Sequence, residues 1–587
     1  MNAITKLKNC QTKVDLAILL NYKPSHLTYL LYKTNPTDRY TQFSIAKKNG
    51  GRRIINSPIE KLKTLQKNLS ILLLDCIDDI NSSKSKKSTL AHGFVREKSI
   101  ITNAQMHKNS KNILNIDLED FFGQFNFGRV RGFFFSNKNF LLHKDIATLI
   151  AQISCHNNEL PQGSPCSPVI TNLITHSLDI KLASMAKKHS CTYSRYADDI
   201  TFSTRKNKFP EQIMAQNETE FIPNPRLNKA ISRSGFKLNH KKTRIQYKDS
   251  RQDVTGLIVN KKIGVKKEYR QITKSMCNSL FHTGEFTKLV DGKHEKGSIG
   301  ELEGRLNFID SIDLYNRLNY STKLSIHYQH RNYGHNTRAL LSGRERTLSK
   351  FLFYKSFFAN DEPTILCEGK TDNIYLKSAL KVLAPNYPML VQDAVGTQAT
   401  KLLVNFFNYS KRTRFLLELY GGTSYLVGFI YSYNTHYSFY KSSKSKNPVI
   451  IVLDNDSGLK EIIKALKKIS TCIIYQEDKI IEKDEKNIKS ADFIHVYHNL
   501  YIVITPLKDG KDTMIEDFFE PKLWKTKRNL REFDPTEKKE PKEKYYGKNT
   551  FATEVVSPNK STINFDGFKP LFDRMTQILE HYQTTPT

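Results

Sequence analysis

Hydrophobic and polar positions follow two different patterns along this chain. Apolar residues recur at helical spacing over residues 1–40 and 60–80, and a strand-like alternation over residues 40–57 surrounds a glycine turn. Later, uninterrupted apolar runs at residues 363–367 and 448–453 are typical of strands that are buried on both faces. The patterns predict a mixed first part and a later α/β part with a parallel sheet.

Two adjacent carboxylates, Asp198 and Asp199, stand at residues 196–199 (Tyr-Ala-Asp-Asp). The flanking residues are rich in β-branched and aromatic types, which predicts two short strands joined by a tight turn. Bare carboxylates so close together repel each other, whereas a pair of Mg²⁺ ions removes that conflict and serves phosphoryl transfer. For this pair alone, a solvated acidic turn is the alternative.

A third carboxylate, Asp117, ends a strand-like run at residues 111–117. Between it and the acidic pair lies the stretch Leu-Pro-Gln-Gly-Ser-Pro-Cys-Ser-Pro at residues 160–168. The three blocks, in this order and spacing, resemble the palm of reverse transcriptases. The resemblance implies these catalytic ligands for two Mg²⁺ ions: Asp117, the backbone carbonyl of Leu118, Asp198 and Asp199.

The same resemblance implies a set of nucleotide-binding residues: Lys48, Arg53, Phe121, Phe122, Gln162 and Gly163. Arg53, and after it Lys48, would hold the triphosphate from the fingers hairpin, although a solvated basic hairpin is the alternative. Phe122 takes the place of the steric gate against a ribose 2′-OH. One of the two phenylalanines can be core, because adjacent side chains point apart.

Two short motifs are signatures of retron reverse transcriptases: Asn103 and His107 in Asn-Ala-x-x-His, and Val254, Thr255 and Gly256 in Val-Thr-Gly. Without the motif around it, His107 would be interpreted as a packed, hydrogen-bonded helix residue. Residues 1 to about 345 thus look like a retron reverse transcriptase, with a helical, basic thumb near the end. The family implies a lysine near the triphosphate, and the sequence leaves Lys241 and Lys242 both open.

A second acidic set follows the later strands. Glu368 comes after the run at residues 363–367, and Asp454 and Asp456 come after residues 448–453. Carboxyl ends of parallel strands meet at one sheet edge, where such acids can hold one or two Mg²⁺ ions. Together with Asp372, they resemble the Toprim domain of the OLD-type nucleases. Acids that cap helices after strands are the alternative.

The chain carries a net charge of +33, of which residues 1–350 contribute +28. Nucleic acid is the expected partner of so basic a chain, and the absence of a long apolar run argues against a membrane. None of the eight cysteines forms a Cys-x-x-Cys pair, and the start lacks a signal-peptide pattern. We therefore expect a reduced, cytoplasmic protein; a homo-oligomer is left open.

These observations predict an α/β multidomain chain: a right-hand polymerase followed by a Toprim-like domain with a largely parallel sheet. The expected boundaries are 1–255 for fingers and palm, 256–345 for a thumb-like region and linker, and 346–587 for the Toprim-like domain. The family resemblance implies a retron enzyme that copies its structured RNA, as both primer and template, into RNA-linked DNA from dNTPs.

The second part would then be a Mg²⁺-dependent nuclease that acts on nucleic acid in antiphage defence. Two alternatives are an inactive Toprim scaffold that only binds nucleic acid and a Toprim domain that nicks and rejoins DNA.

Overall fold

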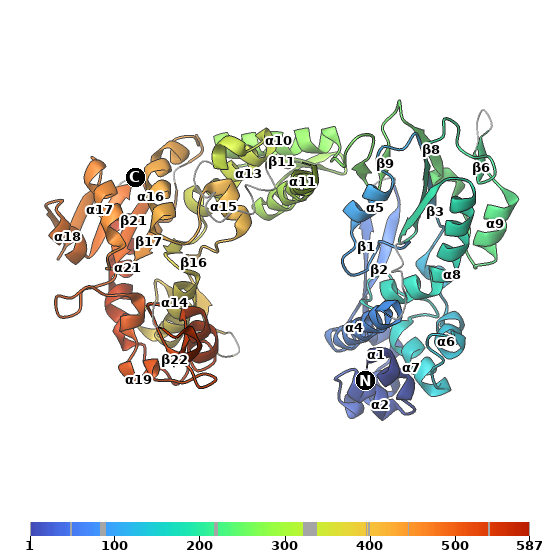
Figure 1. Cartoon of the computed structure of the whole chain (residues 1–587), viewed down its shortest axis with the longest axis horizontal. Helices are drawn as coiled ribbons and strands as arrows, with labels where there is room; N and C mark the ends of the chain where they lie inside the picture. Colours follow the sequence, from blue (N-terminus) through green and yellow to red (C-terminus); the bar gives the residue numbers. More distant parts are fainter. Residues whose placement is uncertain are drawn as a thin grey trace. The chain divides into compact units, whose positions relative to one another are not determined.

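The computed structural model describes residues 2–46, 50–82, 90–216, 221–320, 337–394, 396, 399–443, 445–537 and 540–585. The chain forms two compact units, Met1–Lys267 and Glu268–Thr587 (Figure 1). The predicted residue Lys48 lies outside the described residues.

The first unit contains a bundle of helices and several small antiparallel sheets. Its helices are α1 (Ala3–Asn9), α2 (Lys13–Leu19), α3 (Pro24–Thr28), α4 (Glu60–Ser82), α5 (Ile100–Met106), α6 (Phe127–Ser136), α7 (Lys144–Ser154), α8 (Ser167–Lys188) and α9 (Pro225–Ser232). Its strands are β1 (Tyr40–Ala46), β2 (Arg52–Pro58), β3 (Asn112–Asp117), β4 (Thr192–Tyr196), β5 (Asp199–Thr204), β6 (Met214–Gln216), β7 (Phe221–Pro223), β8 (Arg244–Tyr247), β9 (Asp253–Val254) and β10 (Leu257–Ile258). The predicted hairpin at residues 40–57 and the predicted strands around the acidic turn are confirmed.

A four-stranded antiparallel sheet, in the order β4-β5-β3-β8, carries the acidic turn. Leu114 and Ile116 of β3 and Phe202 of β5 pack into the main core of this unit, which also contains the inner face of α8. Because successive strand residues point to opposite faces, Asn115 and Asp117 face away from that core. The sheet therefore presents its polar face for a site.

The second unit is built around one larger sheet. Its main helices are α10 (Lys267–Thr283), α11 (Ile299–Tyr320), α13 (Gly343–Phe353), α14 (Lys370–Val382), α15 (Lys411–Leu417), α16 (Thr423–Tyr437), α17 (Leu459–Lys468), α18 (Glu485–Ser490), α19 (Pro521–Trp524), α20 (Lys548–Thr550) and α21 (Lys569–Thr584). Its strands are β11 (Thr287–Val290), β12 (Lys293–Lys296), β13 (Thr364–Cys367), β14 (Val391–Gln392), β15 (Lys401–Leu402), β16 (Asn405–Phe406), β17 (Val449–Leu453), β18 (Ile473–Gln476), β19 (Lys479–Ile481), β20 (Phe493–Tyr497), β21 (Leu500–Ile504), β22 (Glu532–Phe533) and β23 (Tyr545–Tyr546).

The seven strands lie in the order β16-β13-β17-β21-β20-β18-β19. The first four are parallel, and the remaining pairings are antiparallel, so the sheet is mixed rather than largely parallel. Alternate strand residues enter two cores: Leu366 and Ile451 pack with α16 and α17, whereas Ile365 and Ile450 pack with α14 and α21. Helices thus cover both faces of the sheet, and Figure 1 shows them around β17 and β21.

Helices α10 and α11 share the first of these cores with the sheet. Leu280 of α10 and Leu302 of α11 belong to the same buried cluster as Val449 of β17. The expected boundaries at residues 255 and 345 therefore do not coincide with the compact units, which divide at Lys267. The hairpin β11–β12 also interrupts a stretch that the spacing predicts to be largely helical.

No helix in the described ranges is long and apolar enough to cross a membrane. All eight cysteines have free thiols.

Candidate active site

The acidic turn of the first unit brings three carboxylates to one end of the sheet. Asp117 of β3 lies directly opposite Asp199 of β5 in the antiparallel register. The backbone N–H of Leu118 donates to the carbonyl oxygen of Asp198 at 3.2 Å. Ala197, inside the turn, has a φ of 54°, an uncommon conformation for a residue with a side chain. The turn is therefore held in place by its surroundings.

A buried ion pair lies beneath this turn. Arg195 donates from Nε and Nη2 to the two carboxylate oxygens of Asp179 at 2.7 and 2.8 Å, and both side chains are fully buried. The Nη1 of Arg195 donates to the carbonyl oxygen of Ala197 at 3.0 Å and to Oδ1 of Asn172 at 3.1 Å. A Cβ on Gly93 would stand only 2.8 Å from the backbone nitrogen of Ala197. These contacts fix the turn, and the sequence patterns gave no sign of them.

Asp117 has one cationic and one amide partner, both in the segment that precedes β8. Lys242 donates from Nζ to its Oδ1 and Oδ2 at 3.1 and 2.9 Å, and Asn239 donates from Nδ2 to Oδ1 at 3.0 Å. Of the two lysines that the sequence left open, Lys242 is the one that contacts the acidic site. A cavity of about 140 Å³ opens here, lined by Asn115, Ile116, Asp117, Asp199, Thr201, Lys242, Arg244, Asp253, Thr255 and Gly256.

The electrostatics of the turn favour a bound cation. Burial raises the pKa of Asp199 to about 7, and the carboxylates of Asp198 and Asp117 add to that rise. Burial is also the main cause that raises the pKa of Asp198, while Lys242 and Arg53 act in the opposite direction. Clustered carboxylate oxygens are the ligands that Mg²⁺ prefers. The three acids therefore fit a divalent cation, which would relieve their repulsion.

The predicted nucleotide-binding residues divide into exposed and buried ones. Arg53 is exposed on β2 and close enough to Asp198 to lower the pKa of that carboxyl. Phe121 is 3% exposed and stacks on Phe236, so it is a core residue, whereas Phe122 is only partly buried. Phe122 thus stays the candidate for a gate.

Gln162 and Gly163 lie against the fingers strand β2. The N–H of Asn56 donates to the carbonyl oxygen of Gln162 at 2.9 Å. Gly163 has a φ of 128°, and a Cβ there would stand 2.6 Å from the carbonyl oxygen of Asn56. In this structure, the close approach that the glycine allows is to β2; an approach to a nucleotide stays a prediction.

The first family motif packs against the back of the acidic hairpin. His107 is fully buried, with Nε2 at 2.7 Å from Ser194 Oγ and Nδ1 at 2.8 Å from Ser203 Oγ. The hydroxyl of Ser194 donates to Oδ1 of Asn103 at 2.6 Å. Because that hydroxyl has one proton, Ser194 accepts from Nε2–H of the neutral ring. Asn103 and His107 therefore join β4 and β5 to α5 and do no chemistry in this arrangement.

The second family motif forms a tight hairpin between β9 and β10. Thr255 and Gly256 have φ values of 47° and 82°, as a two-residue turn with two left-handed positions requires. Val254 is fully buried, whereas Thr255 and Gly256 line the cavity beside Asp117. The motif thus builds one wall of that cavity.

The second unit gathers acids at the carboxyl ends of its parallel strands. Thr423 donates from Oγ1 to Oε1 of Glu368 at 2.5 Å, and the N–H of Gly422 donates to the carbonyl oxygen of Glu368 at 2.9 Å. Burial raises the pKa of Glu368, and the nearby Asp456 and Asp372 raise it further although the Thr423 hydroxyl lowers it. The predicted acids of two strands therefore lie together.

Asp454 connects this cluster to two residues that were not in the predicted site set. Its Oδ1 accepts from the N–H of Ile515 at 2.9 Å, and burial, Asp372 and Glu516 hold its pKa well above the usual value. Glu516 is fully buried, and Lys548 donates to its Oε2 at 3.0 Å, while its Oε1 has no hydrogen-bond partner in the described structure. An orphaned carboxylate oxygen fits a cation.

No three histidine, cysteine or acidic side chains in the described ranges are already arranged to bind a metal ion. Lys548 was missed because it follows a charged, proline-containing stretch that reads as a loop. Only its hydrogen bond to Glu516, 32 positions earlier in the chain, shows that Lys548 belongs to the acidic cluster.

Comparisons with known proteins bear on the first unit. The family model for reverse transcriptase (RNA-dependent DNA polymerase) matches residues 45–270. The chain is 29% identical over 332 residues to the Retron Mx162 reverse transcriptase of Myxococcus xanthus, a match that covers 53% of this chain and 65% of that protein. It is 32% identical over 278 residues to the Retron Ec86 reverse transcriptase of Escherichia coli, covering 47% of this chain and 77% of that protein.

Among solved structures, the telomerase of Candida albicans with a telomeric RNA fragment aligns with a TM-score of 0.31 and 11% identity, over 53% of this chain and 63% of that one.

The site and the family match define the first unit as a reverse transcriptase domain. The chain belongs to the retron reverse transcriptase family. It spans less than two thirds of the first of these relatives, 65% of its length.

Proposed function

We propose that this chain is the RNA-directed DNA polymerase of a retron. The observation that supports this most is that Asp117 and Asp199 face each other across the sheet and line one cavity, with Asp198 next to them in the turn, in a chain of the retron reverse transcriptase family. Its primer and template would be its own structured RNA, its substrates dNTPs, and its product RNA-linked DNA. The excess of positive charge in the first unit suits such partners.

The residues of the first unit divide this work. Mg²⁺, held by Asp117, Asp198 and Asp199 with the Leu118 carbonyl, would neutralise charge on the attacking and leaving oxygens. Arg53 provides bidentate hydrogen bonds to phosphate oxygens. Lys242 neutralises Asp117 in this structure and would bind the triphosphate when a nucleotide is present.

Specificity for deoxynucleotides would rest on the partly buried ring of Phe122. A ring beside the sugar leaves no space for a 2′-OH, whereas Phe121 is already committed to the core.

Primer extension on an RNA template with Mg²⁺ tests the polymerase. Asp198→Asn keeps the size of the side chain but removes a charge from the acidic turn, so we expect DNA synthesis to be lost while RNA binding is retained. Asp249→Asn, in an exposed turn of the same unit, is the matched control and should leave synthesis unchanged. A fully active Asp198→Asn enzyme would contradict the assignment of the acidic turn as a polymerase site.

We further propose that the second unit is a Toprim-like, Mg²⁺-dependent nuclease that acts in antiphage defence. Glu368, Asp454, Asp456 and Glu516 form an acidic cluster at the carboxyl ends of parallel strands, and the unpaired Oε1 of Glu516 leaves room for a cation. Mg²⁺ there would polarise a phosphodiester and its attacking water. Lys548 neutralises Glu516 and holds it in position.

Cleavage assays on DNA and RNA, with and without Mg²⁺, test this second function. Asp454→Asn keeps an oxygen that can accept from the N–H of Ile515, so it should fold normally yet lose Mg²⁺-dependent cleavage. Binding of nucleic acid without cleavage by the wild type would favour the inactive scaffold. Religated products instead of fragments would favour a domain that nicks and rejoins DNA.

A further inference from the structure

A cavity of about 280 Å³ in the second unit contains none of the residues assigned to catalysis above. Its lining combines two aromatic rings with charged side chains: Lys508, Asp509, Lys511, Asp512, Thr513, Asp517, Phe519, Pro521 and Trp524. Its volume lies near the lower end of the range of about 300–1,000 Å³ that ligand pockets in proteins have.

The indole of Trp524 is held in a fixed orientation at this cavity. Its Nε1 donates to the carbonyl oxygen of Glu516 at 3.2 Å, and Phe533 packs against it edge-on with ring centroids 6.0 Å apart. Phe519 beside it is buried, whereas Trp524 is only partly buried. The cavity thus has a preformed aromatic surface on which another ring can stack.

Two lysines stand on a tight turn at the same cavity. Lys508 and Lys511 pair through their backbones in both directions, and Asp509 and Gly510 between them have φ values of 52° and 70°. Neither lysine has an ion-pair partner in the described part of the chain. By contrast, Asp512 is paired with Lys489 at 2.8 Å.

A second acid of the lining, Asp517, is also engaged within the protein, since its Oδ2 accepts from the N–H of Met514 at 2.7 Å. The two ammonium groups are thus left without an ion-pair partner among the described residues, against the single remaining acid Asp509, and they suit an anion such as a phosphate.

An isolated β-bridge joins the wall of the cavity to the acidic cluster. Thr513, in its wall, exchanges backbone hydrogen bonds with Asn455 at 2.9 and 3.0 Å, and Asn455 stands between Asp454 and Asp456. Paired strands are about 4.8 Å apart, and nucleotides of a strand follow each other at about 3.4 Å or more. A nucleotide in the cavity would thus be a near neighbour of a phosphodiester at the acids.

We propose that this cavity is a nucleotide subsite of the nuclease, which receives one unstacked base of the substrate strand. The base stacks on Trp524, and the adjoining phosphate binds Lys508 and Lys511. This inference rests on the proposed nuclease function and specifies its substrate as single-stranded nucleic acid, or a strand from which a base has been turned out. Aromatic stacking with neighbouring basic groups is the usual way to bind such strands without a fixed sequence.

Trp524 is the only tryptophan of the chain, so its fluorescence reports on this cavity alone. We would titrate a short single-stranded DNA oligonucleotide into the full chain in EDTA, where metal-dependent cleavage cannot occur. Stacking should quench the indole fluorescence in a saturable way. A blunt DNA duplex of the same sequence should quench it at least about tenfold more weakly, because its bases remain stacked in the helix.

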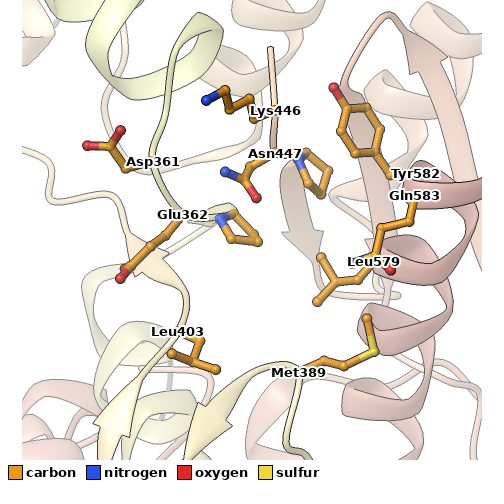
Figure 2. A pocket seen from close by; sticks show the side chains of 11 residues that line it. Asp361, Glu362, Met389, Leu403, Lys446, Asn447, Leu579, Tyr582 and Gln583 are labelled. Atoms are coloured by element: carbon orange, nitrogen blue, oxygen red, sulfur yellow. The ribbon is translucent and has the colours of Figure 1, made fainter. Parts of the chain in front are cut away.

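The double variant Lys508→Ala/Lys511→Ala should raise the midpoint of this titration about tenfold or more, and the effect should shrink at high salt. The matched control is Lys446→Ala. Lys446 is an exposed lysine that lines another cavity of the same unit, about 260 Å³ in volume, at the amino-terminal edge of the parallel strands (Figure 2). Its removal should leave the midpoint unchanged.

Cleavage provides the second measurement. Trp524→Ala should raise KM for a single-stranded substrate about tenfold and change kcat little, because stacking contributes to binding and not to the chemical step. Cleavage without any quenching would contradict the proposed subsite but would still support the nuclease function. Quenching without cleavage would support the proposed subsite and would contradict the proposed nuclease function. Equal quenching by duplex and single-stranded DNA would contradict the proposal that the cavity binds an unstacked base.

Discussion

At the scale of single residues, the acidic turn depends on the buried guanidinium of Arg195. This group joins Asp179, Asn172 and the carbonyl of Ala197, so it connects α8 to the turn that presents Asp198. A buried, hydrogen-bonded ion pair is costly to break, because the remaining charge has no water to replace its partner.

We predict that Arg195→Lys lowers both stability and DNA synthesis. Lysine keeps the charge but cannot reach Asp179, Asn172 and Ala197 together, so the free energy of unfolding should fall by about 3 kcal/mol. The turnover of the folded enzyme should also fall about tenfold, since a lost charge-assisted hydrogen bond costs about 1.5–3 kcal/mol in positioning. Urea unfolding and primer extension at low temperature measure the two effects. Arg226→Lys, exposed on α9, is the control, and an unchanged turnover would leave Arg195 a purely structural role.

Sequence patterns pointed to Asp117, Asp198 and Asp199 because one of these acids ends a strand and the other two stand in a turn. They missed Arg195 because its position in a strand, between Ser194 and Tyr196, looks like any exposed strand position. Its role arises only when α8 brings Asp179 against it, 16 positions earlier in the chain. Phe121 and Phe122 show the reverse: alternation predicts that one is core, and the structure identifies it as Phe121.

At the scale of elements, helix α5 is joined to β4 and β5 through a neutral histidine. Burial lowers the pKa of His107 from 6.5 to about 3, and the nearby His92 adds to this. Between these values the unfolded chain binds a proton that the folded chain does not, so stability is lost as pH falls from about 6.5 towards 3.

We predict that His107→Gln removes this part of the pH dependence. Glutamine can bond to Ser194 or Ser203 but has no titrating proton. Near pH 7.5 the variant should be less stable than the wild type by about 1 kcal/mol, for one poorly made hydrogen bond. Between about pH 6 and 4, the wild type should lose about 1.4 kcal/mol per pH unit more than the variant. Urea unfolding across this range measures the difference, and parallel curves would contradict a buried neutral histidine.

The elements of the second unit were only partly predictable. Strands β13 and β17 follow from their apolar runs. The hairpin β11–β12 was missed, since Lys288, Lys293 and Lys296 dominate a segment without clear alternation. The acidic segment Ile515–Phe518 is a single 3-10 turn, and the N–H groups of Met514 and Ile515 at its start donate to Asp517 and Asp454.

Helices α10 and α11 illustrate how packing decides where a unit ends. Their basic, helical pattern suits a thumb, yet Leu280 and Leu302 are buried with residues of the seven-stranded sheet. A buried charge network adds to this: Arg317 of α11 pairs with Glu345 of α13, which also accepts from Arg412 of α15 at 3.0 Å. Sequence distance alone cannot reveal such long-range burial.

We predict that Leu280→Ala destabilises the sheet and not only α10. Leu280 is 1% exposed, and a Leu→Ala change in a core costs about 2–5 kcal/mol. Amide hydrogen exchange should therefore become faster in β13 and β17 as well as in α10. Ile272→Ala, on the exposed side of the same helix, should leave exchange in the strands unchanged. Faster exchange confined to α10 and α11 would instead support the boundary expected near residue 345.

At the scale of the whole molecule, the two acidic clusters belong to different compact units. Residues 117, 198 and 199 lie in the first, and residues 368, 454, 456 and 516 lie in the second. Changes at distant, independent sites usually add without interaction. The proposed thumb helices, however, fold with the second unit, so a change that unfolds that unit would also remove them from the polymerase.

We predict a separation of the two functions by isosteric changes. Asp454→Asn keeps an acceptor for the N–H of Ile515 and should abolish nuclease activity and phage protection, with RNA-linked DNA at the wild-type level. Asp198→Asn should abolish the RNA-linked DNA, while the purified protein keeps its cleavage of added nucleic acid. Both quantities are measured in cells and with purified protein for each variant. Asp478→Asn, in the exposed turn between β18 and β19 and outside both proposed sites, is the matched control.

Leu280→Ala distinguishes a shared fold from a shared site. Because α10 is buried against the sheet, its truncation should lower both activities together as temperature rises, whereas Asp454→Asn lowers one at every temperature. Loss of RNA-linked DNA in Asp454→Asn would mean that the two acidic clusters act as one catalytic system. Full phage protection by Asp454→Asn would leave the second unit as a scaffold, since an acid at the centre of its cluster would then have no chemical task.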